Sequence, residues 1–134
     1  MKTSENSIKF VENAQLTGGN DRYLSVIVHT GVVLESWRHS LYSFEWLKPD
    51  GTIKSIDELP EHEKPKREAI EQKIKSGKAI ERPVLGIGIM DNVEIGLGRA
   101  EFLTLAAHGV ERIAVHILKS NESDFKLFRA DIKS

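Results

Sequence analysis

The chain has 134 residues, with 19 lysines and arginines against 20 aspartates and glutamates, so its formal net charge is −1. This length suits one domain, and the balanced charge excludes a protein that binds nucleic acid through a strongly basic surface. The absence of cysteine excludes disulfide frameworks, cysteine-ligated metal centres and thiol nucleophiles. The composition, 40% hydrophobic and 29% charged, is that of an ordinary globular protein.

The beginning of the chain is polar. Residues 1–7 are expected to be disordered, and no apolar run is long enough for a membrane segment or a signal peptide. We therefore expect a cytoplasmic protein, without a membrane contact, whose single domain spans residues 1–134.

The next part of the chain is expected to be extended. Residues 8–16 predict a short strand, and residues 17–21 predict a turn because they combine Thr, Gly, Asn and Asp. Residues 22–30 are almost continuously apolar and rich in β-branched side chains, which predicts a central strand buried on both faces. Residues 32–34 are expected to continue as an extended segment.

A hairpin is predicted in the aromatic-rich part of the chain. Three aromatic residues alternate with other residues over 41–47, which indicates a strand. The Pro-Asp-Gly sequence at residues 49–51 is typical of a turn, and residues 52–54 would return as the second strand.

The aromatic side chains of this region allow two interpretations. They form either half of the core or, if they are exposed, a surface that stacks nucleobases or grips a peptide. The residues concerned are Trp37, Tyr42, Phe44 and Trp46.

A short turn and a longer helix are predicted after this hairpin. Ser55 and Glu58 have the spacing of a capping box, which predicts one short turn. A longer helix is predicted over residues 63–76, with Pro65 in its first turn and Gly77 as its stop. Its apolar stripe is thin, so we expect it to pack lightly on the fold.

The last third of the chain predicts a helix, a strand and a helix. Residues 99–108 have an apolar face and are followed by Gly109, which favours a helix. Residues 111–118 are mostly apolar and predict a strand. Asn121 can cap a last helix whose Phe125, Phe128 and Ile132 are spaced three and four apart.

Residues 83–89 and 93–97 predict a second hairpin. A three-residue loop over 90–92 would place every branched residue on one face, with Asn92 in the left-handed conformation that closes such loops. The pairs expected in this register are Ile89 with Val93, Ile87 with Ile95, and Leu85 with Leu97.

This register leaves a glycine-lined face on the other side of the hairpin. The face carries Gly86, Gly88, Gly96 and Gly98, and only Glu94 stands on it. Strand glycines usually mark a close approach of other backbone. One interpretation is therefore that the helix predicted over residues 99–108 packs on this face. A ligand, a peptide or a second copy of the chain is the alternative.

The segment from Gly96 to Arg99 runs from a strand into a helix. This geometry aims backbone N–H groups and the positive end of the helix dipole at an anion, which favours a phosphate-bearing ligand. Neither glycine-rich phosphate motif is present, and Glu101 would repel an anion.

Two histidines interrupt the most apolar strands. His29 and His116 are either core residues or, if they meet across neighbouring strands, an acid/base pair. By elimination, the partners available for catalysis are Asp91, Glu94, Ser25 and Thr30. No two of the five histidines have a metal-binding spacing, so we expect no metal and no cofactor.

Together these patterns predict a single α+β domain: a mostly antiparallel sheet of about six strands with two main helices and a short C-terminal helix. The favoured function is a non-catalytic binding or regulatory protein. Its partner would be another protein or a second copy of itself, joined through an open sheet edge or the glycine-lined face. A small enzyme or a phosphate-ligand domain using Gly96 to Arg99 is the alternative. Single-stranded nucleic-acid binding is a third reading, and the balanced charge argues against it.

Overall fold

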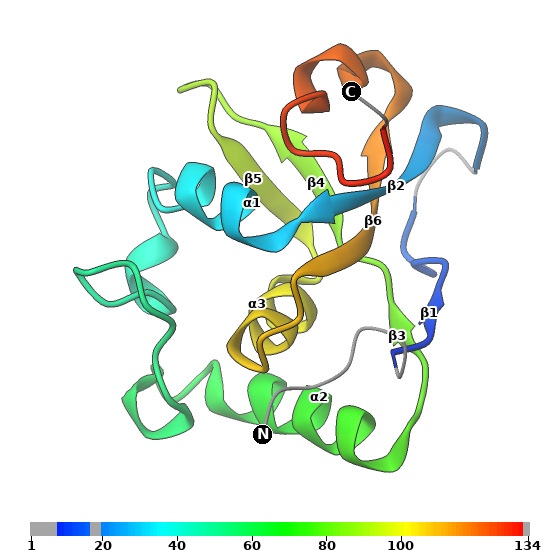
Figure 1. Cartoon of the computed structure of the whole chain (residues 1–134). Coiled ribbons are helices and arrows are strands. Elements are labelled where there is room, and N and C mark those ends of the chain that lie inside the picture. Colours follow the sequence, from blue (N-terminus) through cyan, green and yellow to red (C-terminus); the bar gives the residue numbers. More distant parts are fainter. Residues whose placement is uncertain (1–7, 17–19, 133–134) are drawn as a thin grey trace.

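The computed structural model describes residues 8–16 and 20–132 (Figure 1). The predictions for residues 1–7, and for 17–19 of the first turn, lie outside the described residues. The elements are β1 (Phe10–Val11), β2 (Tyr23–His29), α1 (Thr30–Trp37), α2 (Lys64–Ser76), β3 (Ile80–Glu81), β4 (Val84–Ile87), β5 (Val93–Leu97), α3 (Arg99–Ala107) and β6 (Arg112–Leu118).

The fold has mixed α and β content, as predicted, but its sheets differ from the prediction. The described residues form a four-stranded sheet of order β2-β6-β4-β5 and a separate two-stranded sheet of β1 and β3, instead of one sheet of about six strands. The larger sheet is mostly antiparallel. Its one parallel pair, β4 with β6, arises because α3 carries the chain from β5 across to the far side of β4.

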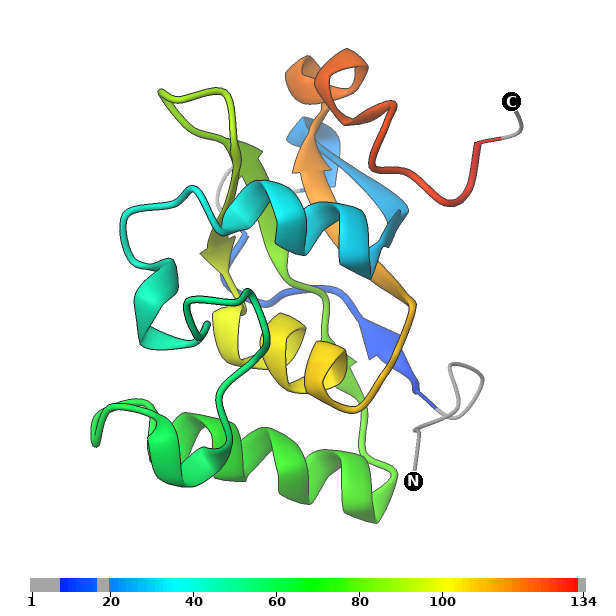
Figure 2. The ribbon, with the colours of Figure 1, turned by 60° about the vertical axis from the view of Figure 1, so that its left-hand side comes forward.

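The core lies between one face of the four-stranded sheet and helices α1 and α3, which both cover that face (Figure 2). The strand residues that point into it alternate along each strand, as period-two geometry requires. The buried residues at this face are Val26, Val28, Leu85, Val93, Ile95, Ile113, Val115 and Ile117 from the strands, and Val33, Trp37, Phe102, Leu103 and Leu105 from the helices.

Helix α2 packs on α3 and lies farther from the sheet (Figure 2). Its predicted limits are confirmed, since Pro65 is in the first turn and Gly77 follows the last residue. A polar contact joins α2 to the end of α3: Glu71 Oε1 lies 2.5 Å from Nε2 of His108, the residue that follows α3. Within α2, Arg67 Nε donates to Glu71 Oε2 of the same pair at 2.9 Å. This pairing explains how a helix with a thin apolar stripe is held.

Residues 32–34 are helical, so the prediction of an extended segment there was wrong. They belong to α1, whose buried residues Thr30, Val33 and Trp37 are spaced three and four apart. That spacing puts them on one face of a helix. The β-branched side chains of Val32 and Val33 favour strands locally, and burial of the helix face overrides this preference.

Strand β2 lies at the edge of the sheet and not at its centre, which corrects the prediction for residues 22–30. Only Val26 and Val28 are buried along it. The C-terminal segment pairs with its free edge: His29 N donates to Phe128 O at 2.8 Å and Ala130 N to Ile27 O at 2.7 Å. The C-terminal segment therefore pairs with the edge of β2 in the place of a further strand.

The predicted C-terminal helix is also absent from the described residues. Residues 119–125 form two short 3-10 turns, Lys119–Asn121 and Ser123–Phe125. Phe125 is fully buried and Phe128 packs against it, with ring centroids 5.6 Å apart. The helical spacing of these aromatics was misleading because the backbone of Phe128 and Ala130 bonds to β2 instead of continuing a helix.

Residues 41–47 do not form a strand. Ser43–Glu45 is a 3-10 turn, and the predicted hairpin is reduced to one antiparallel bridge between Leu47 and Ile53. The Pro-Asp-Gly turn itself is present, with Gly51 N donating to Lys48 O at 2.8 Å. The capping box of Ser55 and Glu58 is confirmed.

The β4–β5 hairpin forms, but its loop begins one residue earlier than predicted. Gly88 N donates to Asn92 O at 2.8 Å, so residues 89–91 make the three-residue loop, and Asp91 instead of Asn92 has positive φ (62°). The observed pairs are Ile87 with Val93, Gly86 with Glu94, Leu85 with Ile95 and Val84 with Leu97. From Leu85 to Ile87, each residue of β4 is therefore paired with a residue two positions earlier in β5 than predicted. A shift of two residues leaves every side chain on the predicted face of the sheet, as far as the irregularity between Val84 and Leu85.

Two further predictions are confirmed with small changes of length. Residues 99–107 form α3, and residues 112–118 form β6. The strand expected over residues 8–16 is limited to β1, which pairs in parallel with β3. Within the part of the chain that the structure describes, none of the helices has the length and apolarity needed to cross a membrane.

Candidate functional site

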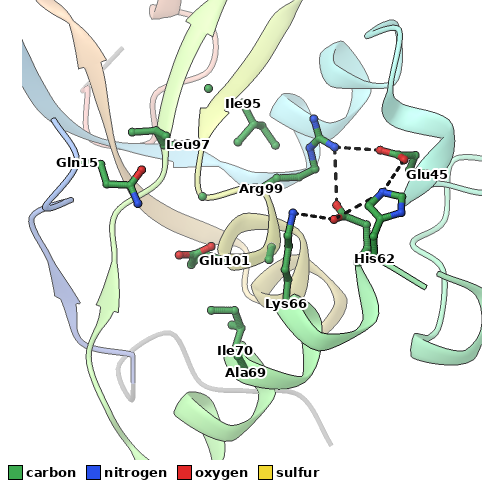
Figure 3. A pocket seen from close by; sticks show the side chains of 14 residues that line it. Gln15, Glu45, His62, Lys66, Ala69, Ile70, Ile95, Leu97, Arg99 and Glu101 are labelled. Carbon is green, nitrogen blue, oxygen red and sulfur yellow. Dashed lines mark hydrogen bonds and ion pairs between the residues drawn. The ribbon is translucent and has the colours of Figure 1, made fainter. Parts of the chain in front are cut away.

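A pocket of about 590 Å³ opens at the corner where β5 passes into α3 (Figure 3). Its volume is within the range of small-molecule sites. The walls are residues 95–101 of this corner, the start of α2 with His62, Glu63, Lys66, Ala69 and Ile70, and two residues from elsewhere, Gln15 and Glu45.

The corner is built around Gly98. This residue has φ +80° and precedes α3, and a Cβ placed on it would lie 2.9 Å from Pro83 Cα. Only glycine combines this left-handed conformation with so close an approach. The sharp turn puts the first backbone N–H groups of α3, which have no acceptor one turn earlier, at the pocket wall.

A cluster of charged side chains lines one side of the pocket (Figure 3). Arg99 Nη1 lies 3.2 Å from Glu45 Oε1 and 3.8 Å from Glu63 Oε1. Lys66 Nζ lies 3.0 Å from Glu63 Oε2, and His62 Nε2 lies 3.1 Å from Glu45 Oε2. Side chains from three separate parts of the chain therefore converge here.

Glu63 is the buried member of this cluster, with 4% of its surface exposed. Trp46 Nε1 donates a hydrogen bond of 2.8 Å to its Oε1. Burial by itself raises the pKa of Glu63, but the hydrogen bonds from Trp46 and Lys66 and the charges of Lys66 and Arg99 outweigh burial and lower the pKa below its usual value. A buried carboxylate at the pocket is thus ionised at neutral pH.

The structure brings some of the predicted glycine-face residues to the pocket and leaves the others elsewhere. Gly96, Gly98 and Arg99 line it. Gly86 lies outside it, and a Cβ at that position would meet nothing within 4 Å. The expected packing of a helix against this glycine is therefore wrong.

Glu94 and Gly88 also lie outside the pocket and have a structural explanation. Glu94 accepts hydrogen bonds from Ser40 Oγ at 2.6 Å and from Asn92 Nδ2 at 3.0 Å. Its Cγ would lie 2.9 Å from a Cβ on Gly88. The glycine makes room for a carboxylate that ties the hairpin to the segment after α1.

His29 and His116 do not meet. Ser25 is opposite His116 and His29 is opposite Arg112, so the two histidines are four register positions apart, about 13 Å along the strands. His116 is buried; its Nδ1 lies 3.2 Å from Ser25 Oγ, and its Nε2 accepts from Asn13 N at 3.4 Å.

These contacts of His116 settle its hydrogen-bonding role. Because Nε2 accepts a hydrogen bond, the proton of the neutral ring is on Nδ1, which donates to Ser25 Oγ. A ring in this tautomer does not take a proton from Ser25. Among the described residues, no side-chain hydrogen bond joins His29 or His116 to the other candidates for catalysis, Asp91, Glu94 and Thr30.

The four aromatic residues separate into two pairs. Trp37 and Trp46 are buried in the core, whereas Tyr42 and Phe44 are 54% and 65% exposed. The two tryptophans therefore form no surface. Trp37 nevertheless borders the charged cluster, since the Arg99 guanidinium lies 6.0 Å from its ring centroid.

Four functional candidates were missed by the sequence analysis: Glu45, His62, Glu63 and Lys66. Glu45 and His62 are 17 residues apart, and no periodic pattern connects them. The adjacent pair His62-Glu63 lies just before α2, where sequence signals describe only the start of a helix. Only the tertiary fold brings these side chains together.

A second, more open pocket of about 730 Å³ lies beside the start of α1. Its lining includes Thr30, Gly31, Val32 and Val110, with His29 and Glu111 as the ionisable residues. It has no convergence of several charged side chains like that at the β5–α3 corner. The corner pocket is therefore the stronger candidate.

Comparisons of the chain with protein-family models, with curated proteins and with solved structures found no match. The chemistry of the corner pocket is therefore what indicates a function.

Proposed function

We propose that this protein binds a small phosphate-bearing molecule, of nucleotide size, in the pocket at the β5–α3 corner. The observation that carries the proposal is the convergence of the α3 N-terminus with the side chains of Arg99 and Lys66 on one pocket. Backbone N–H groups at a helix start and a planar guanidinium are the donors that suit phosphate oxygens.

The acidic residues of the pocket define what the ligand must provide. Glu45 and Glu63 now pair with Arg99 and Lys66, and Glu101 adds a third carboxylate to the walls. A ligand has to compete for the two cations, so a single weak anion is a poor candidate. Di- and triphosphates, which have more charge and more oxygens, fit this requirement better.

Thermal denaturation tests the proposal. We expect ATP, coenzyme A or pyrophosphate to raise the melting temperature by several degrees, since a ligand at about 100 times its Kd contributes about 2.7 kcal/mol. Adenosine, which has no phosphate, is expected to have no effect. Arg99→Ala should abolish the rise, whereas Arg112→Ala, which removes an exposed arginine on β6, should preserve it.

Two results would overturn the proposal. One is the absence of any rise with all three phosphate-bearing compounds. The other is an equal rise in the wild type and in Arg99→Ala, because the phosphate would then bind elsewhere.

A contact with another protein chain, which the sequence analysis favours, is the second candidate. The observation in its favour is the end of the β4–β5 hairpin, where the neighbouring side chains of Ile89 and Met90 are strongly exposed. Exposed apolar side chains grouped in this way are typical of interaction sites. The edge of β2, by contrast, is already paired with the C-terminal segment.

A further inference from the structure

We propose that Glu45, His62 and Glu63 bind a divalent transition-metal cation at the side of the corner pocket. One nitrogen of the histidine and one oxygen of each carboxylate all lie within 4.8 Å of one another. His62 Nε2 is 3.1 Å from Glu45 Oε2 and 4.0 Å from Glu63 Oε2.

These separations are close to those of a coordinated ion. Metal–ligand bonds of 2.0–2.2 Å in tetrahedral geometry place neighbouring donor atoms about 3.4 Å apart. The two measured distances lie on either side of this value, so small side-chain rotations complete the site. His62 is largely exposed and contacts the cluster through Nε2 alone, whereas Glu63 is fixed by its hydrogen bond from Trp46.

The donor set indicates the class of metal. Imidazole nitrogen suits Zn²⁺ and other first-row transition metals, whereas Mg²⁺ and Ca²⁺ favour sites made of oxygen alone. One nitrogen with two carboxylate oxygens therefore points to Zn²⁺ or Mn²⁺. Three protein ligands leave coordination positions open on the pocket side, as in sites where a metal binds water or a ligand oxygen.

The two cations of the cluster, Arg99 and Lys66, now neutralise its carboxylates, and metal binding would make them available to the phosphate ligand. Arg99 is held by Glu45 and Glu63, and Lys66 by Glu63. A metal ion bound to Glu63 Oε2 displaces Lys66 from that oxygen, and its charge weakens the pairing of Arg99 with Oε1 of both carboxylates. Both cations then become available to phosphate oxygens in the pocket. This coupling rests on the proposed phosphate ligand, whereas the metal site itself does not.

Calorimetric titration of the full chain with Zn²⁺ alone and with Mn²⁺ alone, without phosphate, tests the site. We expect one ion per chain and weaker or no binding of Ca²⁺. His62→Ala should weaken binding roughly tenfold or more. His39→Ala is the matched control, since this exposed histidine lies outside the cluster and its loss should leave the affinity unchanged.

Electron paramagnetic resonance of bound Mn²⁺ provides a second measurement. The signal of free Mn²⁺ should decrease on addition of the wild type and return in Glu45→Gln, which keeps the shape of the side chain and removes its charge. Equal binding by the wild type and His62→Ala, or no binding of either metal at millimolar concentration, would overturn the inference.

The failures of the two proposals are distinguishable. Stabilisation by ATP or pyrophosphate that depends on Arg99 but needs no metal, combined with no metal binding, would leave the phosphate proposal standing and remove the metal site. One Zn²⁺ or Mn²⁺ bound through His62, with no effect of any phosphate compound, would leave the metal site standing and remove the phosphate proposal.

Discussion

His116 shows how a single residue holds the N-terminal segment on the sheet. It is buried and lies on the face of β6 opposite the main core. Its two ring nitrogens bond to Ser25 on β2 and to the backbone of Asn13. Asn13 adds a hydrogen bond of 3.0 Å from its Nδ2 to Arg82 O. The histidine is a structural link and has no free nitrogen for catalysis.

The burial of His116 predicts how stability depends on pH. Burial, aided by the charge of Arg82 and opposed by Glu12, lowers the pKa of His116 below its usual 6.5. The unfolded chain then binds the proton more tightly than the folded chain, so the free energy of unfolding decreases as the pH falls below about 6.5. Urea denaturation of the wild type at pH 7.5 and pH 5.5 should show this decrease.

His116→Gln provides the comparison. Its amide can still donate to Ser25 and accept from Asn13, but it does not titrate. We expect a smaller difference in stability between the two pH values than in the wild type. An equal difference in both proteins would show that another group is responsible. Six of the described carboxylates, Glu63 and Glu71 among them, also have a lowered pKa. Their usual values of 3.8 or 4.5 lie below this pH range, so they do not affect the comparison.

The residues of the candidate site were predicted only where the signal is local. Arg99, Gly96 and Gly98 belong to one short strand-to-helix segment, and that segment is recognisable in the sequence. Glu45 and His62 come from turns that have no periodic pattern, so their meeting depends on packing of distant segments. When the role of a side chain depends on a partner 17 residues away, no local sequence pattern indicates that role.

Among the elements, the passage from β5 to α3 depends most strictly on one residue type. Gly98→Ala places a methyl group 2.9 Å from Pro83 Cα and forces alanine into φ +80°. We expect a loss of about 2 kcal/mol in the free energy of unfolding, measured by chemical denaturation.

Gly86→Ala is the matched control for this prediction. It also adds a methyl group to a glycine of the same hairpin, but nothing lies within 4 Å of the new atom. The expected change is within about 0.5 kcal/mol. Similar losses in the two variants would contradict the role assigned to the turn.

The elements that could be predicted are those whose ends are marked by local chemistry. Helix α2 has its proline and glycine, and the capping box of Ser55 and Glu58 fixes a short turn. Helix α1 was missed because its valines favour strands in isolation, and the aromatic alternation at residues 41–47 was misread because burial of Trp46 decides that segment. In both cases, contacts with distant parts of the chain override local preference.

The hairpin register shows a finer limit of the same kind. Period-two alternation correctly placed Leu85, Ile87, Val93 and Ile95 on one face. Alternation is unchanged by a shift of two residues in the pairing, so it could not fix the position of the loop. The side-chain hydrogen bonds of Asn92 to Val93 O and to Glu94 favour its place at the start of the strand over a place in the turn.

For the molecule as a whole, the arrangement of sheet edges determines where self-association can occur. The C-terminal segment occupies the edge of β2 through backbone hydrogen bonds of His29 and Ile27. A chain that ends at Leu127 should expose this edge and form larger species in light scattering, because unpaired edge strands recruit other strands. A chain that ends at Ile132 keeps the pairing and is the control. No difference between the two would contradict this role of the segment.

Light scattering also tests the self-association form of the second functional candidate. Association of the full chain that disappears when Ile89→Ser and Met90→Ser are combined would support a contact through the hairpin end. A full chain that stays monomeric from micromolar to millimolar concentration would contradict self-association there.

The strand order itself could not be predicted. The sequence indicates which segments are extended, but the parallel pairing of β4 with β6 follows from how α3 packs on the sheet. The same holds for the pairing of β1 with β3, whose residues are about 70 positions apart. Such nonlocal pairings are the result of burial across the whole chain.

The position of Arg99 above Trp37 gives the protein an optical reporter of its own. The guanidinium lies 6.0 Å from the indole centroid and belongs to the charged cluster of the pocket. Any molecule that draws Arg99 toward the pocket changes the electric field at an indole shielded from solvent, and hence the wavelength at which it emits. Occupancy can therefore be followed by light, without attaching a dye.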